Sequence, residues 1–127
     1  FRSFNLLVAQ KGLEDKGFNT FLAYNGKEAL ELVGKLNEEG ICPALILMDL
    51  EMPIMDGIEA TKILKERMEL NELPEIPIIG LSANDNEVTT AACLDAGMSK
   101  YCRKPLLEKD LIQLLKEYNL ISGTDSL

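Results

Sequence analysis

Apolar residues recur at helical spacing in five stretches of the chain, and short apolar runs lie between these stretches. Residues three or four apart share one face of a helix, so this spacing predicts amphipathic helices. The helical stretches are centred on residues 6–13, 29–36, 60–68, 88–92 and 111–118. The strand-like runs are residues 20–23, 44–48, 76–81 and 100–102. This alternation of strands and helices predicts an α/β fold with a parallel sheet.

The run at residues 44–48 is apolar at every position, which is typical of a strand buried on both faces of its sheet. Turn-forming residues separate the elements. They include Gly40, Pro53, Gly97 and Pro105. We therefore expect three layers, with helices on both faces of the sheet, in one domain over residues 1–118. Residues 119–127 are expected to form a tail or linker.

The length of 127 residues fits a single domain. The net charge of −8 argues against nucleic-acid binding, because that binding relies on Lys and Arg to neutralise phosphates. No apolar run approaches the ~20 residues that span a bilayer. We expect a cytoplasmic domain without membrane contact, although a longer parent protein could be membrane-attached. Cys42, Cys93 and Cys102 form no C-x-x-C pair and are expected to be idle thiols in a reducing compartment.

The sequence contains no histidine. This excludes a serine or cysteine nucleophile activated by a histidine of this chain, and it excludes histidine metal ligands. A nucleophile or metal ligand within these residues must therefore be a carboxylate, a hydroxyl or a backbone group.

Three polar side chains of different chemistry follow the predicted strands. Asp49, Ser82 and Lys104 each lie at or near the carboxyl end of one strand. Ligands of parallel α/β sheets bind outside these carboxyl ends. A carboxylate, a hydroxyl and a cation are thus expected at one rim, which is the combination that phosphate chemistry on an aspartate needs.

Each of these residues also has a simpler interpretation. Asp49 could be the first polar residue of a loop, and Lys104 a solvated surface lysine. Ser82 opens the run SANDN, in which any of four side chains could cap the following helix. Asp56, before Gly57, is typical of a turn or a helix cap. The joint placement of the first three residues at strand ends favours a functional interpretation.

Three motifs extend this pattern. They are LILMDLEMPIMDGIEAT at residues 45–61, PIIGLSA at 77–83, and AGM at 96–98 followed by YCRKP at 101–105. In order and spacing they resemble the phosphoacceptor segment, the switch strand and the closing segment of response-regulator receiver domains, especially those of hybrid histidine kinases. The similarity extends from about residue 5 to residue 118.

The resemblance implies a flavodoxin-like fold with strand order 2-1-3-4-5. It implies that Asp49 accepts a phosphoryl group, that Ser82 bonds this group, and that Lys104 pairs with the acceptor and phosphoryl oxygens. The donor would be a histidine kinase or a histidine phosphotransfer protein. The domain itself would be a phosphoacceptor in a phosphorelay rather than a turnover enzyme, while its parent could be a hybrid histidine kinase.

Four further residues receive roles from the resemblance alone. Tyr101 and Pro105 would belong to the switch, with a cis peptide bond before the proline. Glu51 and Asn84 lie where such domains tune the lifetime of the phosphoryl group.

The N-terminal segment departs from the family pattern. Receiver domains begin with a strand that ends in two adjacent acidic residues, which hold Mg²⁺. When residues 5–10 are aligned with the family's first helix, this acidic pair falls at or before Phe1. We therefore expect a sheet whose first strand is missing or is supplied from elsewhere, for example by strand exchange or a dimer. We also expect the chain to be a truncated piece of a competent receiver.

The same departure affects the expected Mg²⁺ cofactor, because only Asp49 and the backbone carbonyl of Glu51 remain from the family's ligand set. The Glu51 carboxylate is a candidate substitute ligand.

One alternative function is a pseudo-receiver, which would bind proteins without phosphotransfer. A second is a phosphohydrolase, because Asp49-Leu50-Glu51 mimics a D-x-D pair. In that case Glu108 and Asp110 are the nearest further carboxylates after Lys104, and they are typical of the first turn of a helix.

Overall fold

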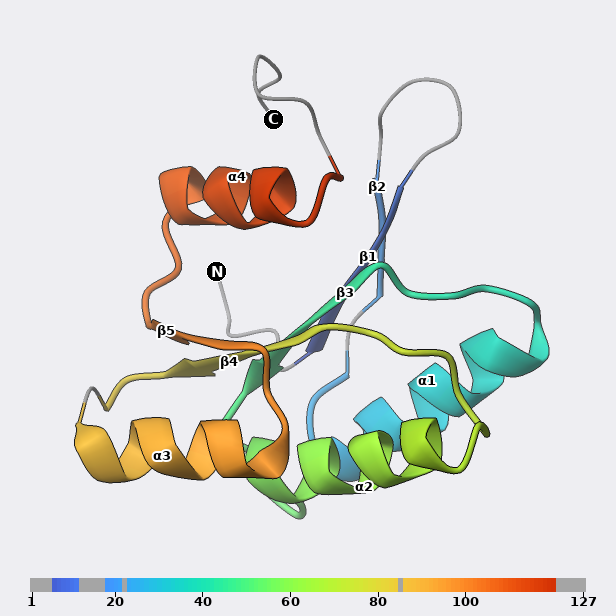
Figure 1. Cartoon of the computed structure of the whole chain (residues 1–127), viewed down its shortest axis with the longest axis horizontal. Helices are drawn as coiled ribbons and strands as arrows, with labels where there is room; N and C mark the ends of the chain where they lie inside the picture. The colour runs from blue at the N-terminus through green and yellow to red at the C-terminus, as the bar shows by residue number, and fades with distance from the viewer. Residues whose placement is uncertain (1–5, 12–17, 22, 85, 121–127) are drawn as a thin grey trace.

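The computed structural model describes residues 6–11, 18–21, 23–84 and 86–120 of the chain (Figure 1). The elements are, in order, β1 (Leu6–Lys11), β2 (Phe18–Phe21), α1 (Gly26–Glu38), β3 (Leu45–Asp49), α2 (Gly57–Glu69), β4 (Ile78–Ser82), α3 (Glu87–Ala96), β5 (Lys100–Arg103) and α4 (Glu108–Glu117). The strands and helices predicted after residue 13 are therefore confirmed. The strand ends are shifted by at most two residues.

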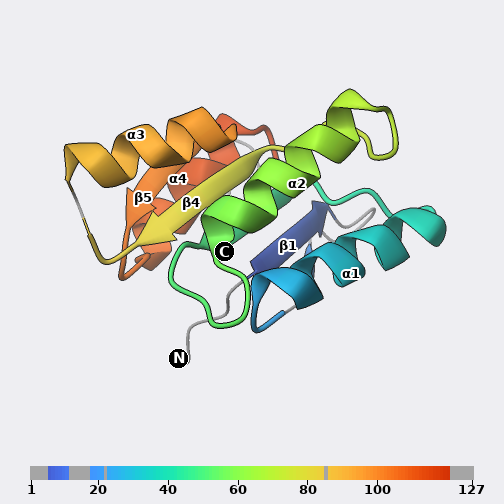
Figure 2. The same cartoon turned by 90° about the horizontal axis from the view of Figure 1, so that it is seen from below.

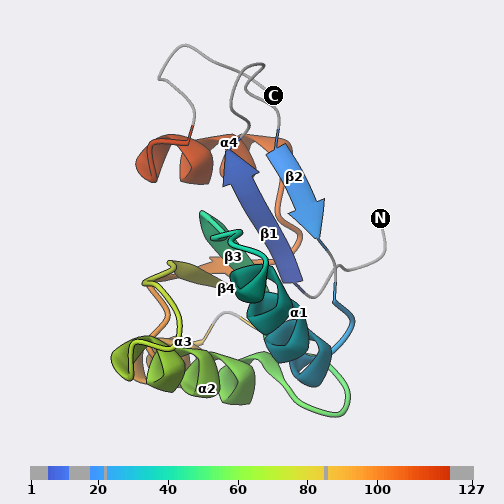
Figure 3. The ribbon, with the colours of Figure 1, turned by 90° about the vertical axis from the view of Figure 1, so that its right-hand side faces the viewer.

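The described strands form one sheet in the order β2-β1-β3-β4-β5. β3 pairs with β4, and β4 with β5, in parallel, as the alternation of strands and helices predicted. β1 lies between β2 and β3 and runs antiparallel to both neighbours. Figure 3 shows β1 and β2 side by side, with β2 at the edge of the sheet.

The prediction of a helix around residues 6–13 is wrong for its described part, because Leu6–Lys11 forms β1. This segment, which the alignment assigned to the family's first helix, supplies the strand between β2 and β3 that was expected to be missing or supplied from elsewhere. Residues 6 to 9 pair with residues 48 to 45 of β3. This pairing provides hydrogen-bond partners for backbone groups at the border of β3 that would otherwise be unsatisfied. The stabilisation from strand pairing outweighs the local preference for a helix. Residues 12–17 lie outside the described part.

Helices cover both faces of the sheet, as expected. Side chains of β3 alternate between two apolar clusters, because successive residues of a strand point to opposite faces. Ile46 and Met48 pack on the side of α1, α2 and α3, whereas Leu45 and Leu47 pack with Leu114 of α4. Figures 1 and 2 show α1, α2 and α3 on one side of the sheet, and Figure 1 shows α4 on the other. All five residues of β3 are buried, which explains its unbroken apolar run.

Side-chain caps fix where three of the helices begin. Asn25, Asp56 and Asn86 accept hydrogen bonds from the third residue beyond each, at 2.9, 2.9 and 2.8 Å, respectively. Such caps satisfy amide groups that have no partner within the helix. The interpretation of Asp56 as a helix cap is confirmed. In the run after β4, Asn86 is the cap, so Ser82 is available for another role.

The described end of the chain packs against the sheet. Leu120, at the start of the predicted tail, is buried in the cluster formed with α4, and its N–H donates to the Leu115 carbonyl at 2.8 Å. Residues 121–127 of that tail lie outside the described part. Within the described residues, every helix is too short or too polar to cross a bilayer.

Candidate functional site

The parallel register of β3, β4 and β5 brings three distant segments to one edge of the sheet. Asp49 pairs with Leu81, and Ser82 pairs with Arg103. The hydrogen bonding continues beyond the strand ends, because Leu50 N donates to Leu81 O at 2.9 Å and Lys104 N donates to Ser82 O at 2.8 Å. The three polar residues predicted to converge are therefore held at the same rim by backbone hydrogen bonds.

Asp49 is the buried carboxylate of this rim, with only 1% of its surface exposed. Its Oδ2 atom accepts a hydrogen bond from Lys104 Nζ at 2.9 Å, and its Oδ1 atom accepts one from Glu51 N at 2.9 Å. Burial of a carboxylate is costly unless it is paired and hydrogen-bonded, and both conditions are met here. One ammonium group and one backbone amide thus fix the orientation of this carboxylate.

Gly57 allows the start of α2 to approach Asp49 closely. A Cβ atom at Gly57 would overlap the backbone carbonyl oxygen of Asp49. The Gly57 N–H donates to Leu50 O at 3.2 Å, which ties the first residue of α2 to the residue after β3. The Asp56-Gly57 pair that the sequence marks as a turn therefore combines a helix cap with a close backbone contact.

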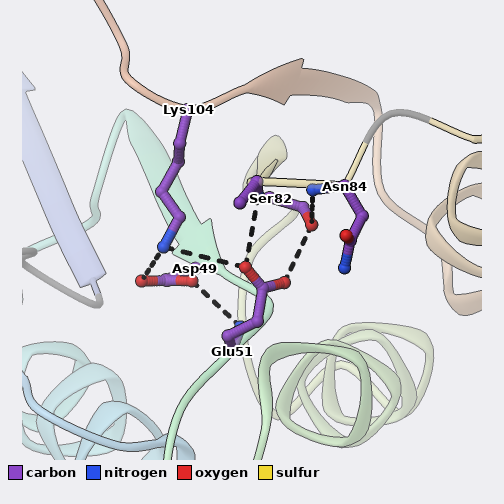
Figure 4. Close-up of polar contacts among 6 residues, drawn as sticks. Asp49, Glu51, Ser82, Asn84 and Lys104 are labelled. Carbon is purple, nitrogen blue, oxygen red and sulfur yellow. Dashed lines mark hydrogen bonds and ion pairs between the residues drawn. The ribbon is translucent and has the colours of Figure 1, made fainter.

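The Glu51 carboxylate bridges the ends of β4 and β5 (Figure 4). Ser82 Oγ donates to its Oε2 atom at 2.8 Å, and Ala83 N donates to its Oε1 atom at 3.2 Å. Lys104 Nζ lies 3.8 Å from the same Oε1 atom. The sequence analysis predicted that Glu51 tunes the phosphoryl lifetime and offers its backbone carbonyl, and as a candidate its carboxylate, to Mg²⁺. It missed the bridge from this carboxylate to Ser82 and to the Ala83 amide. The available signal was the position of Glu51 two residues after Asp49, on the same rim.

Ser82 is fully buried, and its hydroxyl group both donates and accepts. Besides donating to Glu51, Ser82 Oγ accepts a hydrogen bond from Asn84 N at 3.0 Å. Asn84 is exposed, and its side chain points away from the Asp49 carboxylate in Figure 4. The backbone of Asn84, rather than its carboxamide, therefore orients the serine.

The two residues assigned to a switch lie beside this rim. Tyr101 of β5 is half-buried and packs against the apolar cluster on the α1, α2 and α3 side. The Lys104–Pro105 peptide bond is cis, as the resemblance implied. Pro105 itself is exposed.

Two of the cysteines, Cys93 and Cys102, have environments that fit weak nucleophiles. Burial raises the pKa of the Cys93 thiol, and the negative charge of Glu51 adds to this shift. Burial also raises the pKa of Cys102. A thiol with a raised pKa stays neutral at physiological pH, which agrees with the expectation that these cysteines are not catalytic.

The described residues do not fit a magnesium site. Among them no cluster of three or more acidic or other metal-binding side chains is present. Asp49 and Glu51 are the carboxylates at this rim, and their oxygens accept hydrogen bonds from Lys104, Ser82 and two backbone amides. Mg²⁺ usually keeps several waters and binds through one or two carboxylates with free oxygens in octahedral geometry. A magnesium ion at this rim would therefore have to displace these hydrogen bonds.

The acidic residues beyond Lys104 belong to the start of α4. Asp110 Oδ2 accepts a hydrogen bond from Leu107 N at 3.2 Å, and Glu108 is the first residue of this helix. Asp110 therefore acts as a first-turn carboxylate, as predicted.

A comparison with protein families agrees with this geometry. The model of the response regulator receiver domain matches residues 3–116. The chain belongs to this family. Hybrid signal transduction histidine kinase B of Dictyostelium discoideum is 37% identical over 124 residues, which cover 90% of this chain and 6% of that protein. The chain thus corresponds to a small part of the length of the curated relatives that it matches.

Solved receiver domains share the fold. The receiver domain of the histidine kinase CKI1 from Arabidopsis thaliana, complexed with Mg²⁺, is 31% identical with a TM-score of 0.61, and the match covers 73% of this chain and 68% of that one. The receiver domain of Ssk1 from Saccharomyces cerevisiae, co-crystallised with the histidine phosphotransfer protein Ypd1, has a TM-score of 0.66 and 28% identity. The latter match covers 83% of this chain and 76% of that one.

Proposed function

We propose that this receiver domain accepts a phosphoryl group on Asp49 from a phosphohistidine of a partner protein. The supporting observation is the convergence of the Asp49 carboxylate, the Lys104 ammonium group and the Ser82 hydroxyl group at one sheet edge. Lys104 contacts both carboxylates of the rim, and Ser82 contacts one of them.

The transfer needs no proton abstraction by this chain. An Asp49 oxygen attacks the phosphorus atom, a P–O bond forms, and the P–N bond to the donor histidine breaks. The bonding electrons of the P–N bond remain on the histidine nitrogen. Phosphoryl transfer depends mainly on positioning and on stabilisation of negative charge. Here Lys104 supplies the positive charge, and Ser82 and Ala83 supply neutral hydrogen-bond donors.

The donor must lie outside these residues, because the sequence contains no histidine. A histidine kinase or a histidine phosphotransfer protein is the proposed partner. The co-crystal of the similar Ssk1 receiver with Ypd1 supports this choice of partner class. The names of the relatives support a hybrid histidine kinase as the parent protein.

The test uses a radiolabelled phosphohistidine transfer protein as donor and measures acid-stable, base-labile label on the chain. We expect label on the unaltered chain and none on Asp49→Asn. The matched control is Asp56→Asn, because Asp56 is exposed and an asparagine still caps α2. Retention of label in Asp49→Asn would refute the assignment of the acceptor. Absence of label on the folded, unaltered chain would favour the pseudo-receiver alternative.

A further inference from the structure

The Glu51 carboxylate occupies the hydrogen-bond donors that a phosphoryl group on Asp49 would use. Its two oxygens accept from the Ser82 hydroxyl at 2.8 Å and from the Ala83 amide at 3.2 Å. Its Oε1 atom also lies 3.8 Å from Lys104 Nζ. One carboxylate thus contacts the alcohol, the backbone amide and the cation of the rim at the same time.

This occupied position lies directly beside the acceptor. Lys104 Nζ contacts Asp49 Oδ2 at 2.9 Å, so one ammonium group faces both carboxylates. The backbone N–H of Glu51 donates to the other Asp49 oxygen at 2.9 Å. An anion attached to Asp49 would therefore meet the Glu51 side chain.

The donors cannot serve two anions together. A serine hydroxyl and a backbone amide each carry one hydrogen, and both are directed to Glu51. One ammonium group already faces two carboxylates, and a phosphoryl group would add further negative charge. Like charges at such short separations repel strongly when they are partly buried. The incoming group and the Glu51 carboxylate therefore compete for one place.

Glu51 is free to leave this place by side-chain rotation. Its side chain is 45% exposed, whereas that of Asp49 is 2% exposed. Rotamer changes of exposed side chains take place in picoseconds to nanoseconds and require no movement of the sheet. The backbone amide of Glu51 could keep its bond to Asp49 while the carboxylate turns into solvent.

We propose that the Glu51 carboxylate occupies the hydrogen-bond donors that would otherwise bind a phosphoryl group on Asp49. A phosphoryl group reaches these donors only after the Glu51 side chain has turned outward. This inference rests on the proposed function, because it describes the regulation of the same site. In this proposal Glu51 blocks the site, and its side chain must leave before an anion can bind stably next to Asp49.

The test measures the affinity for inorganic phosphate, which requires no transfer reaction. Phosphate is titrated into the full chain while the backbone amide signals of Ser82 and Ala83 are followed by NMR. We expect Glu51→Ala to bind phosphate about tenfold more tightly than the unaltered chain, which corresponds to release of about one competing interaction. Glu51→Gln should show a smaller gain, because its amide oxygen can still accept these hydrogen bonds.

Two further variants locate the effect. Glu69→Ala removes the same charge from an exposed position in the last turn of α2, and its phosphate affinity should stay within about twofold of the unaltered chain. In the double variant Glu51→Ala with Lys104→Ala, the gain should be lost. Equal phosphate affinity of Glu51→Ala and the unaltered chain would overturn the inference, as would an equal gain in Glu69→Ala.

The two proposals fail separately. Tighter phosphate binding by Glu51→Ala, combined with no label on Asp49, would reject phosphotransfer and support the occupancy of the donors by Glu51. Label on Asp49, combined with unchanged phosphate affinity in Glu51→Ala, would reject the occupancy alone.

Discussion

Lys104 Nζ lies 2.9 Å from Asp49 Oδ2, although the two residues are 55 positions apart in the sequence. The lysine side chain is 29% exposed and the aspartate side chain 2% exposed, so the pair joins a buried acid to a cation that reaches solvent. Removal of a partner from a buried charge leaves that charge uncompensated, which costs more than loss of a surface ion pair.

We expect Lys104→Ala to lower the free energy of unfolding by about 1–3 kcal/mol, because the buried Asp49 carboxylate then loses its cationic partner. It should also reduce label on Asp49 by at least about a hundredfold, since the cation at the site is lost. Urea unfolding and the transfer assay measure the two effects. Lys62→Ala, at an exposed position of α2, is the control and should change neither quantity. Full labelling of Lys104→Ala would contradict the role of this lysine.

Two glycines in helices are expected to respond in opposite directions to alanine. Gly57→Ala should destabilise the domain by about 2 kcal/mol or more, because the new Cβ overlaps the Asp49 carbonyl oxygen. Gly34→Ala should stabilise it by about 1 kcal/mol, because Gly34 lies inside α1 and a methyl group added there would meet no atom within 4 Å. Chemical unfolding of both variants measures the difference. Equal stability of the two variants would contradict the close approach of α2 to β3.

Thr61 offers a second stability test, away from the rim. It is fully buried in α2, and within the described residues its hydroxyl oxygen has no hydrogen-bond partner. Thr61→Val keeps the shape and removes the unsatisfied group, so we expect a gain of about 1 kcal/mol in the free energy of unfolding. Thr90→Val is the contrasting variant, because Thr90 Oγ1 donates to Asn86 O at 3.0 Å, and it should be slightly destabilising. A loss of stability in Thr61→Val would show that the hydroxyl has a partner in solution.

The ion pair between Lys100 of β5 and Glu117 of α4 should make stability depend on pH. The hydrogen bond from Lys100 lowers the pKa of Glu117 below its ordinary 4.5, and the bond to Glu117 raises the pKa of Lys100 above its ordinary 10.5. The depressed carboxyl pKa contributes stability above pH 4.5 that is lost as the pH falls through the lower folded value. The raised lysine pKa contributes stability below pH 10.5 that is lost as the pH rises through the higher folded value.

The loss of stability at low pH is tested with Glu117→Gln, by thermal unfolding at about pH 7 and about pH 2. The variant should melt below the unaltered chain at the higher pH, and the difference should shrink at the lower pH, because protonation of Glu117 removes the charge that pairs with Lys100. Glu69→Gln, at an exposed position of α2, is the control for a lost charge. A difference in melting temperature that stays constant with pH would rule out this contribution.

Local sequence patterns determined most of the architecture after the N-terminal segment. The helical spacing predicted α1 to α4, because amphipathicity is a local property of the sequence. The unbroken apolar run of β3 predicted burial on both faces, and the structure confirms it. The placement of Asp49, Ser82 and Lys104 at one rim also followed from the sequence, because the carboxyl ends of parallel strands meet at one edge.

Only the tertiary structure decided the rest. Leu6–Lys11 has helical spacing, yet it forms an antiparallel strand because pairing with β3 satisfies backbone groups that local propensity does not take into account. The contact of Glu51 with Ser82 depends on the register between β3 and β4, and 31 residues separate the two in sequence. A sequence pattern specifies which groups reach the rim, whereas side-chain geometry in the folded chain determines which of them already bind each other.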